Sequence, residues 1–176
     1  MKVAAVLVPI YRGPDRELRL VLVRRTSYGI HGGQIAFPGG TRISCDGTLV
    51  DTAKRETEEE IGIPAGSMKI LEHLPVIETR STGFRIHPFL ARIVPPKTWK
   101  PDPREIAEVL EVRVKDLSLP ENRGRETRTV HVGQERKKTV RRRISFFRVG
   151  SHKLWGATYR ILDPLVARLV SGEWRV

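Results

Sequence analysis

The stretch TAKRETEEEIGI (52–63) places four glutamates within five positions of a chain whose formal net charge is +12. On a helix, Glu56 and Glu60 lie one turn apart on the same face with Glu59 beside them, so we expect the three carboxylates to converge on one point. Like charges this close destabilise a helix, and a bound cation offsets the repulsion. Ligands that are all oxygen suit Mg²⁺ or Mn²⁺. The pattern predicts a metal site, with a solvated acidic face as the alternative.

Other residues of the same helix support the carboxylates. Arg55 precedes Glu59 by four residues and can pair with it, which orients one carboxylate. Ala53, Thr57 and Ile61 give the helix a modest surface to bury against a sheet, and we expect this surface on the face opposite the carboxylates.

A glycine-rich segment lies just before the helix. In AFPGG (36–40), Gly39 and Gly40 have bare backbones that can approach a metal or a phosphate closely, and Pro38 restricts the chain beside them. The helix itself is predicted from about Thr48 to Ile61, because Gly62 follows the last apolar residue.

The rest of the chain supplies strands and one more helix. Period-two and β-branched patterns predict strands in the following runs, and the chain closes with an amphipathic helix at about 157–171. The predicted strands are KVAAVLVPIY (2–11), ELRLVLVRR (17–25), MKILEHLPVIET (68–79), FRIHPFLARIV (84–94), IAEVLEVRV (106–114), and a hairpin of 127–132 with 139–147 around GQE. With 176 residues and 39% apolar content, we expect one α/β domain over 1–176, in which helices cover a mixed sheet.

The excess positive charge gathers in a basic hairpin at about 123–147. It is either a solvated face or a contact for phosphate or nucleic acid. Because no RNA-binding signature with interleaved aromatic residues accompanies it, we expect a small-molecule partner instead of nucleic acid, with an RNA-directed protein as the alternative. The single cysteine, Cys45, excludes an internal disulfide and a thiolate zinc cage. No apolar run is long enough to span a membrane, so we expect a cytoplasmic protein without a membrane partner.

Residues 40–63 resemble the signature of the Nudix hydrolases, G-x5-E-x7-R-E-U-x-E-E-x-G-U, where U is aliphatic. RETEEEIGI matches the second half at Arg55, Glu56, Glu59, Glu60, Gly62 and Ile63, with Thr57 at an aliphatic position. The first half departs, because Asp46 stands six residues after Gly40 in place of Glu, and eight residues instead of seven separate it from Arg55.

This resemblance implies a Nudix-type α/β/α sandwich, active as a monomer or homodimer, that hydrolyses a nucleoside diphosphate linked to another group. It implies Glu56 and Glu60 as principal ligands of Mg²⁺ or Mn²⁺, with assistance from Glu59. A backbone carbonyl of Gly40 or Gly39 completes the implied protein ligands.

Segments outside the signature are similar to bacterial coenzyme A pyrophosphatases. They are HGGQIAFPGG (31–40), LPVIETRSTGFRIHPFLA (74–91) and LWGATYRIL (154–162). The subgroup motif reads roughly LLTxR[SA]-x3-R-x3-G-x3-FPGG, and Arg24, Gly33 and FPGG fit it, whereas Leu22, Arg25 and Gly29 depart from it.

The implied substrate is a small molecule, coenzyme A or a derivative cleaved to 3′,5′-ADP and 4′-phosphopantetheine, with ADP-ribose or a related compound as the alternative. Arg24, Arg25, His31 and Gly39 are the candidate substrate-binding residues.

The general base of the reaction is not identified by the signature. A base must reach the attacking water, which favours a carboxylate on a loop beside the metal. Glu105, at the end of a proline-rich loop, is our candidate. The alternatives are that Glu105 only pairs with Arg104 at the surface, that Glu108 in the next strand is the base, or that Glu59 is.

Overall fold

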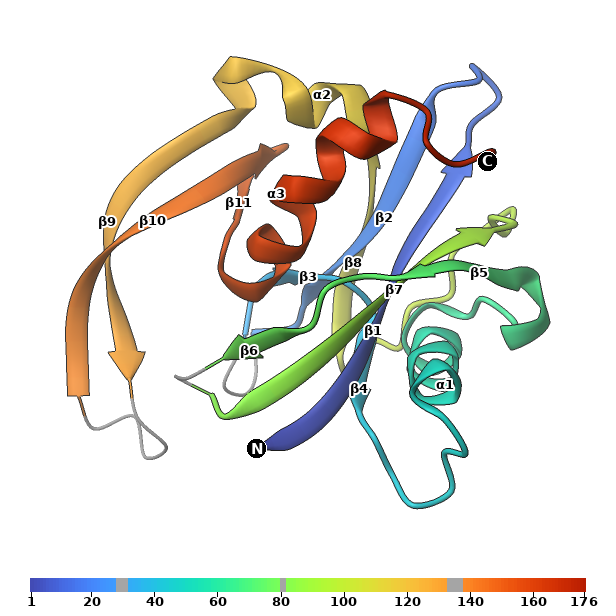
Figure 1. Cartoon of the computed structure of the whole chain (residues 1–176), viewed down its shortest axis with the longest axis horizontal. Helices are drawn as coiled ribbons and strands as arrows, with labels where there is room; N and C mark the ends of the chain where they lie inside the picture. The colour runs from blue at the N-terminus through green and yellow to red at the C-terminus, as the bar shows by residue number, and fades with distance from the viewer. Residues whose placement is uncertain (28–31, 80–81, 133–137) are drawn as a thin grey trace.

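The computed structural model describes residues 1–27, 32–79, 82–132 and 138–176. Within these residues, eight strands form a mixed sheet whose main path runs β3-β2-β1-β7-β5, with β4, β6 and β8 attached at its sides (Figure 1). The strands are β1 (Lys2–Arg12), β2 (Leu18–Arg25), β3 (Ile35–Ala36), β4 (Gly39–Thr41), β5 (Met68–His73), β6 (Ile77–Thr79), β7 (Phe84–Ile93) and β8 (Ile106–Arg113). β1 and β7 are parallel, and the other pairs are antiparallel.

Strand β1 has different partners along its two halves. Ala4, Ala5 and Val6 pair with β4, whereas Ile10 and the residues after it pair with β2. Between the two pairings, the Leu7 N–H donates to the Pro38 carbonyl at 2.9 Å. This arrangement fixes the glycine-rich β4 against the N-terminal half of β1.

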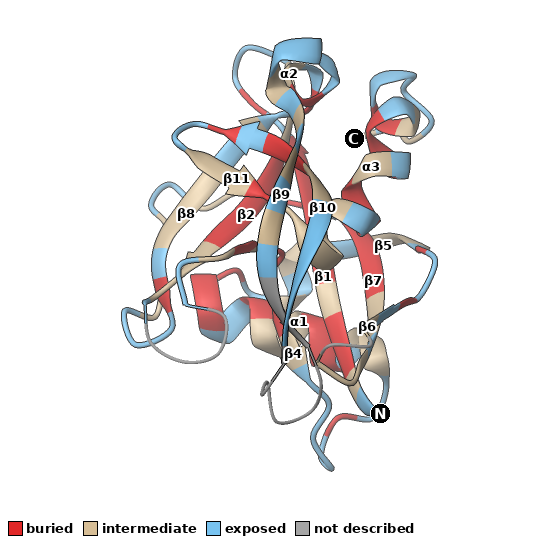
Figure 2. Cartoon of the chain, turned by 90° about the vertical axis from the view of Figure 1, so that its left-hand side faces the viewer, coloured by how far each residue is buried: buried red, intermediate tan, exposed pale blue. Residues whose placement is uncertain are grey.

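A second sheet contains β9 (Arg123–Val132), β10 (Lys138–Val149) and β11 (His152–Leu154). We call residues 123–149 the basic arm. Its strands are longer than predicted, and residues 133–137, which include the predicted GQE turn, lie outside the described residues. The far end of the arm stands clear of the large sheet in Figure 1, and Figure 2 shows its strands as mostly exposed or intermediate.

Helices lie on both faces of the large sheet, which confirms the predicted α/β/α sandwich. Helix α1 (Leu49–Ile61) covers one face, and α3 (Gly156–Val170) and the short α2 (Val114–Ser118) cover the other. Single 3₁₀ turns occur at Ala65–Ser67 and Pro120–Asn122. The described helices include none long and apolar enough to cross a membrane.

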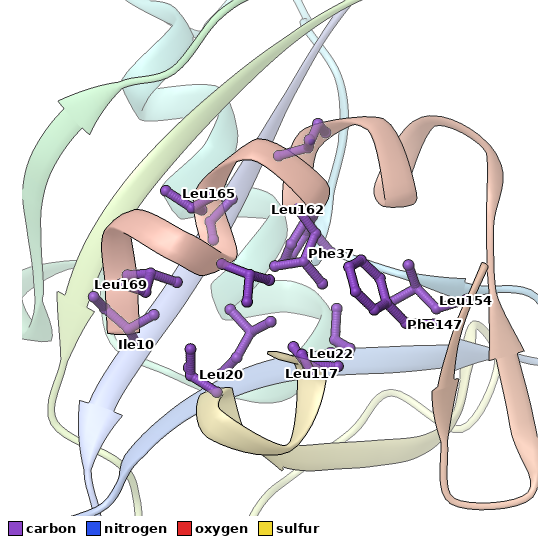
Figure 3. Close-up of a cluster of buried hydrophobic side chains, with 14 of the residues drawn as sticks. Ile10, Leu20, Leu22, Phe37, Leu117, Phe147, Leu154, Leu162, Leu165 and Leu169 are labelled. Atoms are coloured by element: carbon purple, nitrogen blue, oxygen red, sulfur yellow. The ribbon is translucent and has the colours of Figure 1, made fainter. Parts of the chain in front are cut away.

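Two hydrophobic clusters, one on each face, hold these layers together. Side chains alternate along β2, so Leu20 and Leu22 join the α3 cluster while Val21 and Val23 join the α1 cluster. Figure 3 shows Leu162, Leu165 and Leu169 of α3 packed over the sheet, with Phe147 of the basic arm in the same cluster. The residues that follow the arm therefore share a core with β1 and β2.

Candidate active site

Helix α1 carries the acidic residues, and its two ends are well defined. Thr48 and Asp51 form a capping box at the start, in which the Asp51 N–H donates to the Thr48 hydroxyl and the Thr48 N–H donates to the Asp51 carboxylate. Gly62 ends the helix with a φ of 74°, as its position predicted. At the unusual Thr57, the buried hydroxyl donates to the Ala53 carbonyl at 2.7 Å, so the helix tolerates a polar residue there.

The two glycines of β4 allow close backbone contacts on both sides of the strand. Gly39 has a φ of 149°, and a Cβ at this position would lie 2.4 Å from the Ala5 carbonyl oxygen. A Cβ on Gly40 would lie 2.4 Å from the carboxyl carbon of Glu56. Glycine is therefore required at position 39, whereas a side chain at position 40 would displace the carboxylate of Glu56. The backbone of β4 lies directly against the helix carboxylates.

Glu60 is the most buried of the three helix glutamates, with only 3% of its side chain exposed. It accepts the Gly39 N–H at 2.9 Å and Nη2 of Arg25 at 2.9 Å. Burial raises the pKa of Glu60 to about 7, although Arg25 and the Gly39 amide both act to lower it.

Arg55 connects the remaining acidic residues. Its guanidinium binds Asp46 with a fork of two hydrogen bonds, Nε at 2.9 Å and Nη2 at 3.1 Å, and lies 3.0 Å from carboxylate oxygens of both Glu56 and Glu59. Asp46 is itself buried, and its hydrogen bonds from Arg55 hold the pKa of that carboxyl well below its usual range. Asp46 thus positions Arg55, even though it is a shorter acid than the signature specifies.

The prediction that the carboxylates lie opposite the buried surface of the helix is wrong for Glu60. Glu60 is buried together with Ala53, Thr57 and Ile61, because residue 60 follows residue 57 by three positions and shares its face. Glu59 points outward, with 58% of its side chain exposed.

The three carboxylates do not converge on one point in this structure, contrary to the prediction. Within the described residues, no three His, Cys, Asp or Glu side chains form a group with metal-binding geometry. The physical reason is that the carboxylates bind two different arginines: Glu60 binds Arg25, while Glu56 and Glu59 bind Arg55. The donor set still fits a hard divalent cation, because it consists of carboxylate and carbonyl oxygens beside a glycine backbone.

Glu105 lies close to this group. Its main chain forms a turn in which the Glu105 carbonyl accepts the Thr26 N–H at 2.8 Å and the Asp102 N–H donates to the Glu60 carbonyl at 3.0 Å. The Glu105 charge contributes to raising the pKa values of Glu56 and Glu60, although burial is the largest cause of both shifts. Arg104 donates to Asp102 at 2.6 Å, which differs from the proposed surface pair with Glu105.

Arg24 lies away from Glu60, although it is adjacent to Arg25 in sequence. Its Nε donates to Glu108 at 3.0 Å, and Nε2 of His152 lies 3.7 Å from the same carboxylate. Successive side chains of a strand point to opposite faces, so only Arg25 can reach α1. The candidate residue His31 and the departing residue Gly29 lie outside the described residues.

Two features of the site were missed by sequence reasoning. The pairing of Arg25 with Glu60 was not predicted, and the strand alternation that directs Arg25 toward α1 was the available signal. The main partner of Arg55 was predicted to be Glu59, whereas the structure gives Arg55 two hydrogen bonds to Asp46 as well.

Comparisons with known proteins agree with this arrangement. A family model described as the NUDIX domain matches residues 1–131. The uncharacterized Nudix hydrolase NudL of Photorhabdus laumondii is 30% identical over 167 residues, which cover 94% of this chain and 84% of that protein.

Solved structures share the fold at lower sequence identity. A Nudix hydrolase from M. smegmatis, RenU, is 24% identical with a TM-score of 0.55, covering 66% of this chain and 73% of that one. A MutT/nudix family protein from Enterococcus faecalis is 15% identical with a TM-score of 0.60, covering 97% of this chain and 62% of that one.

Proposed function

The chain belongs to the Nudix hydrolase family, whose members hydrolyse nucleoside diphosphate derivatives, and from this premise we propose that it cleaves the pyrophosphate bond of coenzyme A or a derivative. The products are 3′,5′-ADP and 4′-phosphopantetheine. The observation that carries the catalytic part is the contact of two helix carboxylates, Glu56 and Glu60, with the two glycines of FPGG.

The proposed reaction uses Mg²⁺ or Mn²⁺, held by Glu56, Glu60 and the Gly40 carbonyl with assistance from Glu59. When bound, the cation neutralises pyrophosphate charge and polarises the phosphorus that is attacked. Arg55 is a positioning residue in this proposal: it orients Glu56 and Glu59, and Asp46 fixes its guanidinium from the other side.

Glu105 is the proposed general base. It is exposed in a turn next to the carboxylate group, so water can reach it, and its neighbour Arg104 is engaged by Asp102. These features favour Glu105 over Glu108, whose carboxylate already accepts a hydrogen bond from Arg24.

Substrate recognition is proposed to involve Arg25 and the backbone of Gly39 at the pyrophosphate, with Arg24 as a further contact. His31 remains a candidate from the sequence and lies outside the described residues. The departure at Leu22 from the coenzyme A motif is weak evidence against this substrate, because Leu22 is buried. Leu22 has no exposed surface and packs in the α3 cluster, so its replacement of threonine changes the core and does not touch a ligand.

The proposed domain spans residues 1–176, although the family model ends at residue 131. Support comes from Phe147, Leu154 and the apolar face of α3, which lie in the same cluster as Leu20 and Leu22 of β2. Without this C-terminal part, one face of the large sheet would keep only the short α2 as cover.

A substrate panel tests the choice of coenzyme A. Coenzyme A, a thioester derivative, ADP-ribose and a dinucleoside polyphosphate are incubated with the protein and either Mg²⁺ or Mn²⁺, and the product masses are recorded. We expect the highest kcat/KM for coenzyme A or its thioester, with 3′,5′-ADP among the products. A preference for ADP-ribose would overturn the coenzyme A proposal and leave the family assignment intact.

A further inference from the structure

The Arg25 guanidinium contacts a carboxylate oxygen of Glu60, which is a proposed ligand of the cation, and the carbonyl oxygen of Gly39, the residue before the proposed ligand Gly40. Its Nη2 lies 2.9 Å from Oε1 of Glu60 and 3.3 Å from the Gly39 carbonyl oxygen. A single positively charged nitrogen therefore bridges a buried carboxylate and a backbone carbonyl. Carboxylate and carbonyl oxygens are also the ligands that a hard divalent cation takes in proteins.

We propose that Arg25 and the catalytic cation compete for Glu60, so that Arg25 acts as an internal counter-ion that must leave Glu60 when the metal binds. This inference rests on the proposed metal-dependent function. A buried carboxylate without a positive partner is costly, and Arg25 supplies that partner in the metal-free protein.

The contacts of Arg25 allow it to leave Glu60, whereas those of Arg55 hold it in place. The Arg55 guanidinium is held by a fork of two hydrogen bonds to the buried Asp46, which is not a proposed metal ligand. Among the contacts of the described residues, Arg25 hydrogen-bonds through its side chain only to Glu60 and to the Gly39 carbonyl. With 31% of its side chain exposed, Arg25 can move toward solvent without breaking the core.

The exchange also explains how Arg25 can take part in substrate binding. While its Nη2 binds Glu60, Arg25 is not fully available to an anionic substrate. Displacement by the cation frees a guanidinium beside the site, and guanidinium groups bind phosphate well. The cation and the pyrophosphate would then favour each other's binding, because both draw Arg25 away from Glu60.

The experiment is a Mn²⁺ titration without substrate, in which free Mn²⁺ is measured by electron paramagnetic resonance. It compares the wild-type chain with Arg25→Ala, Arg25→Gln, Arg24→Ala and Glu60→Gln. Arg24→Ala is the matched control, since it removes the same charge one residue away but leaves the partner of Glu60 in place. Melting temperatures with and without Mn²⁺ provide a second readout that does not depend on turnover.

We expect Arg25→Ala to tighten Mn²⁺ binding by about tenfold, because a charge-assisted hydrogen bond to Glu60 no longer has to be broken. Arg25→Gln keeps a neutral donor and should give a smaller gain, and Arg24→Ala should change the Kd less than about twofold. Mn²⁺ should raise the melting temperature of Arg25→Ala by more than that of the wild type.

Failure of this inference differs from failure of the proposed function. If Glu60→Gln binds Mn²⁺ as tightly as the wild type, the proposed metal ligand is wrong. If Glu60→Gln loses binding while both Arg25 variants keep the wild-type Kd, the competition is overturned. Equal gains in Arg24→Ala and Arg25→Ala would also overturn it, since the effect would then be a general one of charge.

Discussion

The acidic group on α1 (Glu56, Glu59 and Glu60) and the basic arm both contain many charged residues, but the neighbours of these charges differ. On α1, opposite charges meet: Glu56, Glu59 and Glu60 each lie within 3.0 Å of an arginine. In the arm, which has ten Lys or Arg and two Glu between residues 123 and 149, like charges meet across the ladder, as Arg128 lies opposite Arg142. The acidic group on α1 thus reaches into the folded interior at Glu60 and is paired throughout, whereas the charge of the arm is carried on its surface.

The largest expected effect tests whether the acidic group serves catalysis instead of folding. Glu60→Gln removes the charge of a proposed metal ligand with little change of shape, so turnover should fall by orders of magnitude. The melting temperature of the metal-free protein should stay within a few degrees, because burial already disfavours the charged form of Glu60. Turnover and thermal melting are measured on the same preparation. Retained activity would refute the proposed site.

The second prediction tests whether Glu105, and not a carboxylate that binds an arginine, is the general base. Glu105→Gln should lose most of its turnover, together with the limb of the rate profile that rises with pH, while its Mn²⁺ affinity changes little. Glu108→Gln is the matched control, because that carboxylate pairs with Arg24. If Glu105→Gln keeps the rising limb, the role passes to whichever of Glu108→Gln and Glu59→Gln has lost it.

Much of the fold was predictable because local patterns and tertiary structure agree. Helix α1 begins after Thr48 and ends at Gly62 as expected, and β1, β2, β7 and β8 lie within about a residue of the predicted runs. The run 68–79 was wrong as one strand, because Pro75 falls between β5 and β6. The five-residue α2 was not predicted, since so short a helix has little periodicity of its own.

The residues of the site were predictable, but their partners were less so. Spacing on one helix identified Glu56, Glu59 and Glu60, whereas Arg25 reaches Glu60 from a strand 35 positions earlier in sequence. Alternation along β2 indicates the face on which Arg25 lies, but its contact with Glu60 also depends on how β2 is placed over α1. The same limit applies to Asp46, whose nine-residue separation from Arg55 reveals no pairing until the loop between them is folded.

The third prediction concerns stability at the acidic group. Asp46→Asn removes the charge that holds Arg55, so the melting temperature at pH 7 should fall by several degrees. Because the folded-state pKa of Asp46 is lowered, the stabilisation is present above the usual aspartate pKa and is lost as the pH falls through the lowered value. The difference between variant and wild type should therefore shrink below about pH 4.

A matched control for this loss exists on the surface. Asp15→Asn removes an exposed partner of Arg19 at 2.7 Å, and an exposed ion pair contributes little to stability. Thermal melting from pH 3 to pH 8 should show a clear effect for Asp46→Asn and a small one for Asp15→Asn. Equal losses would mean that Asp46 acts as an ordinary surface charge, which would contradict its burial.

The smallest expected effect lies in the basic arm and has the opposite sign. Arg142→Gln relieves the repulsion with Arg128 across the ladder, so the stability at low salt should rise by a few tenths of a kcal/mol. Glu126→Gln should lower stability instead, because Glu126 pairs with Arg128 at 3.0 Å and also binds Lys153. Both effects should fade as salt is added, since exposed charges are screened. Turnover of the small substrate should stay within about twofold for both variants, since the proposed metal ligands and their arginine partners lie outside the arm. A large loss of turnover in Arg142→Gln would mean that the arm takes part in binding the substrate, and the contrast between the two regions would no longer hold.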